Sequence, residues 1–407
     1  MTSTNNIVFR SEQQQAIDLT VNSLKRNRKM LWNAKMRFGK TLCALEVARL
    51  CGYRRTLILT HRPNVRGEWF ESLLKLKLDG WLFGCKDPNA VAFDAQTFEA
   101  IEAKAKQDKN THYIYFASMQ DLRGSKRVNQ QKGIEKNDHI FNTHWDFLIV
   151  DEAHEGIMSR LGRDVIGELQ KRRTLRTLYL SGTPYNIQQM FDNTEVYHWD
   201  YCMEQSAKAA WTQAHANEPN PYEGLARMNI ITYNLAREMR SYRISETGAF
   251  NFAELFRTEN VPADEATNGA TTRFVHEADV RKFVKLISKN STNKLYPYAN
   301  KQLSGSLDHT LWYVPGVQAA HCLARILSEQ TSDNPFGQYA IVDVAGEGNS
   351  AEERSDIYEQ TKHERDALER VKTAIANNKL TITCPAIASS SASVPVRPPI
   401  GSCCTGI

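Results

Sequence analysis

The chain has 407 residues, too many for one ordinary domain, and its composition, 41% hydrophobic and 24% charged, is ordinary for a globular protein. No run approaches the roughly 18 apolar residues that span a bilayer, the polar N-terminus lacks the apolar core of a signal peptide, and no CxxC pair suggests a zinc site. We therefore expect a cytoplasmic protein with no membrane partner, and its net charge of +5 is compatible with a nucleic-acid partner.

Helical patterns and short apolar runs alternate over the first part of the chain, which we expect to form one domain over residues 1–200. The helical patterns cover residues 11–24 and 42–50, and the apolar runs, each bounded by polar or turn residues, cover 29–32, 56–59, 113–116, 147–150 and 177–180. Short buried strands that alternate with helices predict a parallel sheet covered on both faces, and thus an α/β fold.

This alternation is lost over residues 201–305, which we interpret as an insertion or linker that contains a long helix at 225–240. It returns in residues 306–383, where a partial second domain of the same kind is expected. Its predicted elements are strands at 309–315, 338–346 and 380–383 and helices at 318–330 and 352–377.

The composition changes abruptly at residue 384. The segment 384–407, CPAIASSSASVPVRPPIGSCCTGI, has one charged residue and is rich in serine, proline and cysteine. It has neither helical nor strand periodicity, so we expect a disordered tail. Because the change follows an interior strand, we also expect this tail to be an aberrant end, for example one produced by a frameshift.

A glycine-containing loop, N-A-K-M-R-F-G-K-T, joins the first predicted strand to a helix. Backbone N–H groups of such a loop point at phosphate oxygens, and the helix N-terminus adds positive potential. Lys40 would reach the phosphates, Thr41 would place its hydroxyl on Mg²⁺, and Gly39 would allow a close backbone approach. The chain departs from the general glycine pattern at Ala34 and Arg37, which are still expected to line the nucleotide site.

An acidic tetrapeptide, D-E-A-H, ends the apolar run at residues 147–150. A carboxylate at the carboxyl end of a buried parallel strand lies where α/β sheets bind ligands. Asp151 is placed to hold Mg²⁺ through water, and Glu152 to orient and deprotonate an attacking water. The alternative is a helix cap with acidic residues in its first turn, which the phosphate loop upstream makes less attractive.

Together these motifs resemble the superfamily 2 DEAD/DEAH-box helicases, and the resemblance covers residues 7–200 with weaker similarity over 308–383. Further elements occur in the expected order. They are R-x-x-Q-x-x-A from Arg10, LILTHRP (57–63), YFASMQDL (115–122) and LYLSGTP (178–184). Within the superfamily, AKMRFGKT, DEAH and SGTP look most like the helicase-type Res subunits of type III restriction systems. That likeness implies an ATP- and Mg²⁺-dependent motor on double-stranded DNA, in a restriction or phage-defence system with a methyltransferase or nuclease subunit.

The resemblance also implies roles for residues outside the two central motifs. Gln13 would contact adenine. The residues expected to couple hydrolysis to movement are His154, Ser181 and Thr183. Those expected near the nucleic-acid backbone are Thr60, Arg62 and Ser118, and such contacts position a strand without reading its sequence.

The chain departs from the family in its second half. The second motor domain of such helicases carries a Q-x-x-G-R-x-x-R element whose arginines stabilise transition-state charge, and this sequence lacks it. We therefore expect a second RecA-like domain that is incomplete, with activity reduced or lost. Two alternatives stay open: an RNA helicase, and a truncated subunit that binds ATP without catalysis.

Overall fold

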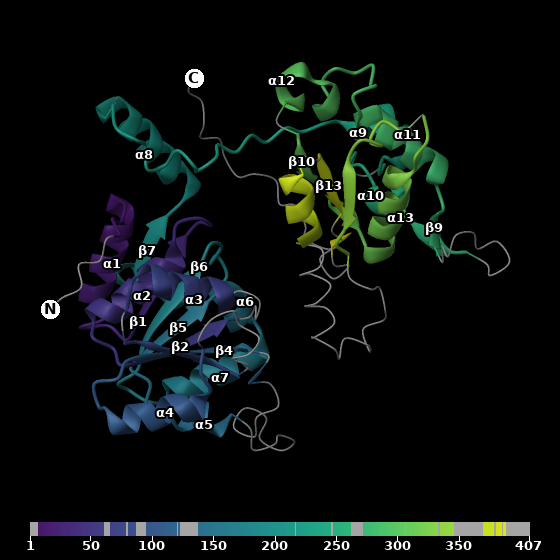
Figure 1. The fold of residues 1–407 in the computed structure, drawn as a ribbon. Coiled ribbons are helices and arrows are strands. Elements are labelled where there is room, and N and C mark those ends of the chain that lie inside the picture. Colours follow the sequence, from purple (N-terminus) through teal and green to yellow (C-terminus); the bar gives the residue numbers. More distant parts are fainter. Residues whose placement is uncertain are drawn as a thin grey trace. The chain divides into compact units, whose positions relative to one another are not determined.

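The computed structural model describes residues 7–60, 66–78, 80–86, 95–119, 121–122, 137–215, 217–245, 247–261, 272–305, 307–332, 334–345, 369–377, 380–384 and 386–387. The chain divides into two compact units, Met1–Asn229 and Ile230–Ile407 (Figure 1).

The first unit is built on a seven-stranded sheet in the order β3-β4-β2-β5-β6-β1-β7, and every neighbouring pair is parallel. The five predicted strands all form. The strands are β1 (Lys29–Ala34), β2 (Arg55–Thr60), β3 (Leu82–Cys85), β4 (Tyr113–Ser118), β5 (Phe147–Asp151), β6 (Arg176–Ser181) and β7 (Val196–Trp199). The predicted α/β fold with a parallel sheet is therefore confirmed.

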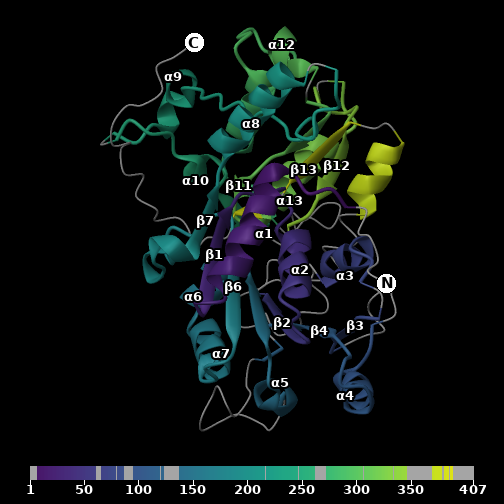
Figure 2. The same cartoon turned by 90° about the vertical axis from the view of Figure 1, so that its left-hand side faces the viewer.

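Helices cover both faces of this sheet (Figures 1 and 2). Successive residues of a strand point to opposite faces, so Leu31 of β1 packs on one face while Met30 and Trp32 pack on the other. The face of Met30 is covered by α1 (Ser11–Ser23), α2 (Lys40–Leu50) and α3 (Arg66–Lys75). The opposite face is covered by α4 (Phe98–Gln107), α5 (Asp138–Asn142), α6 (Ala153–Met158) and α7 (Arg160–Gln170).

The two strands that the sequence did not predict, β3 and β7, are the edges of the sheet. Each has four residues, which is short even for a strand. In β7 the burial alternates, since Tyr197 and Trp199 are buried and His198 is exposed. Such short edge strands carry too few apolar residues to stand out as periodic runs. After β7 the first unit continues with α8 (Tyr201–Ala214).

The second unit contains a smaller parallel sheet in the order β10-β13-β12, with β10 (His309–Leu311), β13 (Thr381–Cys384) and β12 (Ala340–Asp343). Its short pairs are β11 (Val314–Pro315) with β14 (Ala386–Ile387), and β8 (Thr258–Asn260) with β9 (Thr272–Phe274). The helical segments are α9 (Leu235–Glu238), η5 (Arg240–Tyr242), α10 (Phe252–Leu255), α11 (Glu277–Ile287), η6 (Pro297–Ala299), α12 (Lys301–Ser304) and α13 (Val317–Ser328).

Three expectations for this half need correction or qualification. The predicted helix at 225–240 is wrong, because only Leu235–Glu238 is α-helical there. The expected disordered tail from 384 is wrong for its first residues, since Cys384 ends β13 and Ala386–Ile387 forms β14, while residues 388–407 lie outside the described part. Of the helix expected at 352–377, the described portion is helical over 369–376.

Residues from the expected insertion or linker belong to the core of the second unit. Met239, Leu255 and Phe283 are buried in one cluster with Leu323 of α13. The domain boundaries proposed from the sequence stay predictions. None of the helices in the described ranges is both long enough and apolar enough to cross a bilayer.

Candidate active site

The residues singled out by the sequence gather at the carboxyl edge of the large sheet. Pairing register brings the strand ends into line, with Asn33 opposite Ser181 and Thr60 opposite both Asp151 and Ser118. In parallel α/β sheets this edge is where ligands bind. The loop after β1, the acidic tetrapeptide after β5 and the SGTP segment after β6 therefore form one continuous site.

The loop between β1 and α2 has a backbone shaped for anion binding. Gly39 has φ +94° and Arg37 has φ +66°, both in the left-handed region, so the chain turns sharply before α2 begins at Lys40. No side chain caps the N-terminus of α2, which leaves its first N–H groups and the positive end of its dipole available to a ligand. Thr41, half-buried, follows in the first turn.

Lys40 folds back over this loop. Its Nζ donates to the backbone oxygens of Ala34 at 2.7 Å and Lys35 at 3.2 Å. Burial lowers the pKa of Lys40, while the carboxylates of Glu152 and Asp151 act in the opposite direction. The ammonium group is thus partly desolvated and held by neutral carbonyl oxygens, without an ion pair to a described carboxylate.

Gln13 and Arg10 hold the loop from the side of α1. The Gln13 Nε2 and the Arg10 Nη2 donate to the Phe38 carbonyl at 2.7 and 3.0 Å, and Gln13 Oε1 accepts from the Arg10 backbone N–H at 2.9 Å. A Cβ atom at Gly39 would lie 2.6 Å from Gln13 Nε2, so glycine is required there by space as well as by φ. Gln13, the residue predicted to contact adenine, is therefore in contact with the phosphate loop.

Asp151 lies at the end of β5 and is half-buried. Burial, with a smaller effect from Glu152, raises the pKa of Asp151 to about 6. Trp69 of α3 donates its Nε1 to Asp151 Oδ2 at 3.3 Å, and the Glu152 N–H donates to Oδ1 at 3.0 Å. A desolvated carboxylate of this kind favours a nearby cation, as a metal ligand should. Glu152 has φ +47°, an unusual value that turns its side chain out of the strand direction.

His154 connects the acidic tetrapeptide to the SGTP segment. Its Nδ1 lies 2.9 Å from Ser181 Oγ and 3.5 Å from Glu152 Oε2. The Thr183 N–H donates to the same Ser181 Oγ at 3.1 Å. The structure therefore brings together the three residues expected to couple hydrolysis to movement, and joins them to the residue expected to activate water.

Gly182 lets the SGTP segment approach the phosphate loop. A Cβ atom at this position would lie 3.7 Å from the Ala34 oxygen and 3.9 Å from the Met36 nitrogen. The sequence did not single out Gly182, although it lies between two residues that were predicted. The SGTP segment therefore lies close to the backbone of the phosphate loop at this point.

The expected nucleic-acid contacts are less exposed than the prediction requires. Thr60 and Ser118 have side chains that are 0% and 2% exposed. Ser118 Oγ donates to Asp121 Oδ2 at 2.7 Å and accepts from the Asp121 N–H at 3.0 Å. Arg62 lies outside the described residues. All three assignments stay predictions.

Two residues that contact the site, Glu204 and Tyr222, lie far along the chain and were not predicted. Lys35 of the phosphate loop donates its Nζ to Glu204 Oε1 of α8 at 2.6 Å, and Glu204 is fully buried. Tyr222 donates its hydroxyl to Glu12 Oε2 at 2.8 Å, beside Arg10, whose guanidinium lies 5.6 Å from the centre of the Tyr222 ring. The segment after β7 therefore braces both the loop and the start of α1.

These residues fit a nucleoside triphosphate with Mg²⁺. The uncapped helix terminus and Lys40 match the phosphates, and the desolvated Asp151 with the hydroxyl of Thr41 matches a divalent cation. A bound cation would stabilise the charged form of Asp151 and offset the cost of burying it.

Residues 6–186 match the family model described as "Type III restriction enzyme, res subunit". The match covers less than half of the chain, and over it the chain is similar to the res subunits of type III restriction enzymes. The matched segment contains every residue discussed above except those of α8 and Tyr222.

One curated relative extends the comparison beyond this segment. A Mycoplasma pneumoniae protein that carries the name of a type II restriction enzyme and methyltransferase, RM.MpnORF110P C-terminus, is 23% identical over 408 residues, which is 88% of this chain and 53% of the relative. The chain thus spans about half the length of the curated relative that it matches.

Among solved structures, the ATP-dependent type ISP restriction-modification enzyme LlaBIII bound to DNA has a TM-score of 0.50 and 12% identity, covering 95% of this chain and 25% of that one. This likeness supports the fold described above. The Sulfolobus solfataricus SWI2/SNF2 ATPase core in complex with double-stranded DNA has a TM-score of 0.34 and 13% identity, over 95% of this chain and 80% of that one.

Proposed function

We propose that this chain is an ATP-dependent motor that moves along double-stranded DNA, as part of a restriction or phage-defence system that includes a methyltransferase or nuclease activity. The family and the relatives' names support the restriction context. The LlaBIII structure is described as DNA-bound and ATP-dependent, which supports the choice of substrate and fuel for a chain with the same fold.

Each residue of the site has a role in this proposal. The bound Mg²⁺–ATP supplies the phosphoanhydride bond and a cation that neutralises developing charge. Lys40 exchanges its two carbonyl acceptors for phosphate oxygens, while Thr41 and Asp151 hold the cation. Glu152 orients the attacking water and accepts its proton on a carboxylate oxygen. Gln13 senses the base from its position against the phosphate loop.

The observation that carries the proposal is the contact of His154 with Ser181 at 2.9 Å, next to Glu152. A nucleotide-binding subunit needs the loop and the acidic residues alone. A motor also needs a link from the water-activating carboxylate to a segment that can move. The SGTP segment meets this need, since Ser181 contacts His154 and Gly182 lies beside the backbone of the phosphate loop.

The test is ATP hydrolysis by the full chain with and without duplex DNA. The motor proposal expects turnover that duplex DNA stimulates and that is lost in both Lys40→Ala and Glu152→Gln. Stimulation by RNA in place of DNA would favour the RNA helicase alternative. The same assay with both polymers therefore separates the two substrates.

A second candidate is an ATP-binding subunit without turnover. Nucleotide binding that Lys40→Ala abolishes, with no turnover of the wild type on any polymer, would support this candidate and contradict the motor.

A further inference from the structure

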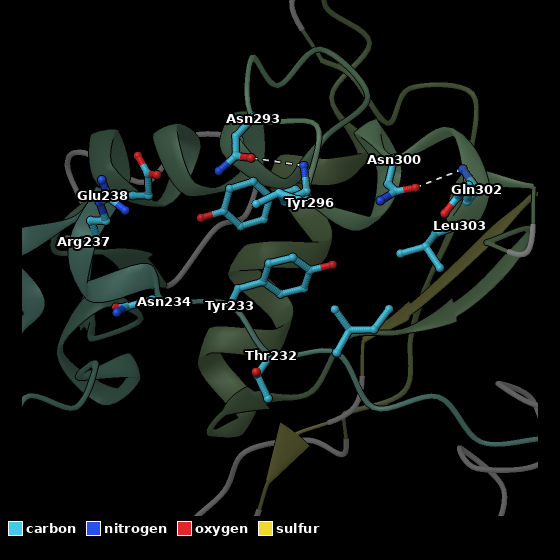
Figure 3. A pocket seen from close by; sticks show the side chains of 12 residues that line it. Thr232, Tyr233, Asn234, Arg237, Glu238, Asn293, Tyr296, Asn300, Gln302 and Leu303 are labelled. Carbon is cyan, nitrogen blue, oxygen red and sulfur yellow. Dashed lines mark hydrogen bonds between the residues drawn. The ribbon is translucent and has the colours of Figure 1, made fainter. Parts of the chain in front are cut away.

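Two adjoining cavities lie on the second unit, beside α9 and η5, and Figure 3 shows the smaller one. They have volumes of about 470 and 780 Å³ and share Asn234 and Arg237 as lining residues. The larger one, here called the arginine groove, is lined by Asn234, Arg237, Arg240, Arg243, Ser245 and Gly248. No role from the sequence or from the active site falls on these residues.

The three arginines point outward because the residues between them point inward. Met239 and Tyr242 are buried in the core of the second unit, and the Tyr242 hydroxyl donates to Asp279 at 2.6 Å. The backbone leaves the helical conformation at Met239, between α9 and η5, yet the three arginines line the same cavity.

The arginines of the groove have no acidic partner among the described residues. Elsewhere in the same unit, exposed arginines are paired, as Arg257 is with Glu254 at 3.2 Å and Arg281 with Glu329 at 2.6 Å. Glu238 is the sole acidic residue that lines either cavity within the described part of the chain. Among the residues that the structure describes, the groove is therefore locally cationic and its arginines have no ion-pair partner.

Neutral donors continue the surface into the smaller cavity. Asn293 and Asn300 accept backbone N–H groups of Leu295 and Gln302 on their Oδ1 atoms, at 3.1 and 2.9 Å, which leaves the Nδ2 groups as donors (Figure 3). The ring of Tyr233 stacks on that of Tyr296 at 5.0 Å. The Tyr233 hydroxyl is shielded from solvent and has no hydrogen-bond partner in the described structure. A buried, unpaired hydroxyl is costly unless a ligand satisfies it.

We propose that the arginine groove and the adjoining amide-lined cavity dock the phosphodiester backbone of duplex DNA. This inference rests on the proposed function and names a contact surface for it. Arginine presents a planar fork that binds phosphate oxygens bidentately, and amide and hydroxyl groups are the other common phosphate contacts. Duplex DNA carries about one negative charge per 1.7 Å of axis, so it offers several phosphates to a groove lined by three arginines. The contact reads no sequence, as a translocating motor requires.

The test is the salt dependence of duplex binding by the full chain, measured by fluorescence anisotropy between about 50 and 200 mM salt. The groove variant is Arg237→Gln/Arg240→Gln/Arg243→Gln. Each phosphate contact contributes about 0.9 to the slope of log K against log salt, so the variant is expected to lose about 2.7 from that slope. The affinity of the groove variant for duplex DNA at low salt is also expected to fall, by at least about tenfold.

The matched control removes the same charge from paired residues. Arg257→Gln/Arg273→Gln/Lys372→Gln takes three cations from the same unit, each of which has a glutamate within 3.2 Å. Its slope is expected to change by well under 1. Should the groove variant unfold, as judged by circular dichroism, Arg240→Gln alone is expected to reduce the slope by about 0.9.

The outcomes separate this inference from the function on which it rests. Equal slopes for groove and control variants, with DNA-stimulated ATP hydrolysis intact in the wild type, would overturn the docking surface and leave the motor standing. An arginine-dependent slope in a wild type whose hydrolysis ignores DNA would support the surface and contradict the motor. Tighter binding of duplex RNA than of duplex DNA of equal sequence would overturn the choice of partner.

Discussion

The cations of the phosphate loop and those of the arginine groove are held in opposite ways. Three cations of the loop and its surroundings are anchored: Lys40 on two carbonyl oxygens, Lys35 on Glu204 at 2.6 Å and Arg10 on Glu12 at 2.6 Å. In the groove, none of the arginines pairs with a described carboxylate. A fixed cation gains from preorganisation toward one ligand, whereas a row of free cations attracts any polyanion that passes.

This difference predicts where substitutions will be severe. Anchored cations belong to a site that depends on geometry, so removing one group, or the group that holds it, should cost much. Free cations act through summed charge, so single losses should be mild and dependent on salt. The following substitutions test the anchored half of this comparison.

Lys40→Ala should have the largest effect. It removes the charge that faces the phosphates and frees the carbonyl groups of Ala34 and Lys35. We expect nucleotide affinity and turnover to fall by about 10²–10³ or more, the range for loss of one preorganised charge donor. Titration with a fluorescent ATP analogue measures the first effect. The control Lys75→Ala removes an exposed lysine of α3, and an equal loss there would contradict a specific role.

Glu152→Gln should separate binding from chemistry. The amide keeps the size of the side chain but cannot accept a proton, so turnover should fall by about 10²–10⁴ while nucleotide affinity changes little. Single-turnover hydrolysis measures the rate of the chemical step, and the binding titration measures nucleotide affinity. Wild-type turnover in this variant would remove Glu152 from the mechanism. Glu71→Gln, on the exposed face of α3, serves as the control.

Lys35→Met tests the ion pair between Lys35 and Glu204. Glu204 is fully buried, and its Oε2 has no hydrogen-bond partner in the described structure, so loss of Lys35 leaves a buried, unpaired carboxylate. Breaking such a pair costs about 3–5 kcal/mol of unfolding free energy. Urea denaturation measures it. The double variant Lys35→Met/Glu204→Gln should recover much of the loss, and no recovery would mean that packing, not charge, is responsible.

Ser181→Ala should weaken coupling. It removes the hydrogen bond to His154, and one such bond is worth about 0.5–1.5 kcal/mol, or up to roughly tenfold in a rate. We expect the ratio of DNA-stimulated to unstimulated hydrolysis to fall by up to that factor. Ser72→Ala, which loses a hydroxyl bonded to the Glu68 carbonyl on α3, should leave the ratio as it is. An unchanged ratio in Ser181→Ala would remove the link from the motor proposal.

Trp69→Phe should have the smallest effect. The ring stays buried, but the donor to Asp151 at 3.3 Å is lost. The Mg²⁺ concentration that half-saturates hydrolysis should therefore shift a few-fold, as expected for one long hydrogen bond. Trp145→Phe, whose Nε1 donates to the Ile140 carbonyl at 2.7 Å on the other face of the sheet, is the control. Identical Mg²⁺ curves for both variants would show that Trp69 only fills space.

Sequence patterns predicted the central strands and the site because both are local. The strand at 147–150 is continuously apolar and ends in the acidic tetrapeptide, so its position and its chemistry coincide. The helix expected at 225–240 does not form because its apolar residues are not buried together. Met228, Ile230 and Ile231 are 58%, 81% and 47% exposed, so no apolar face is buried there to stabilise a helix.

The supports of the site could not be predicted because they join distant parts of the chain. Lys35 and Glu204 are 169 positions apart, and Trp69 and Asp151 are 82 apart. A lysine and a glutamate at that separation have no periodic or motif signal. Their contact depends on how α8 returns to the loop, which is a property of the tertiary fold.

The strand order has a consequence for how the protein is made. β1, which carries the phosphate loop, lies between β6 and β7, so Lys29 pairs opposite Thr177 and Leu31 opposite Val196. The ribosome therefore synthesises this loop early but cannot complete its neighbourhood until β7 has emerged, roughly 7–30 s later at about 5–20 residues per second. Throughout that interval the apolar strand β1 lacks its full set of partners, β6 and β7. The nascent chain should thus depend on chaperones most strongly just before the nucleotide site closes.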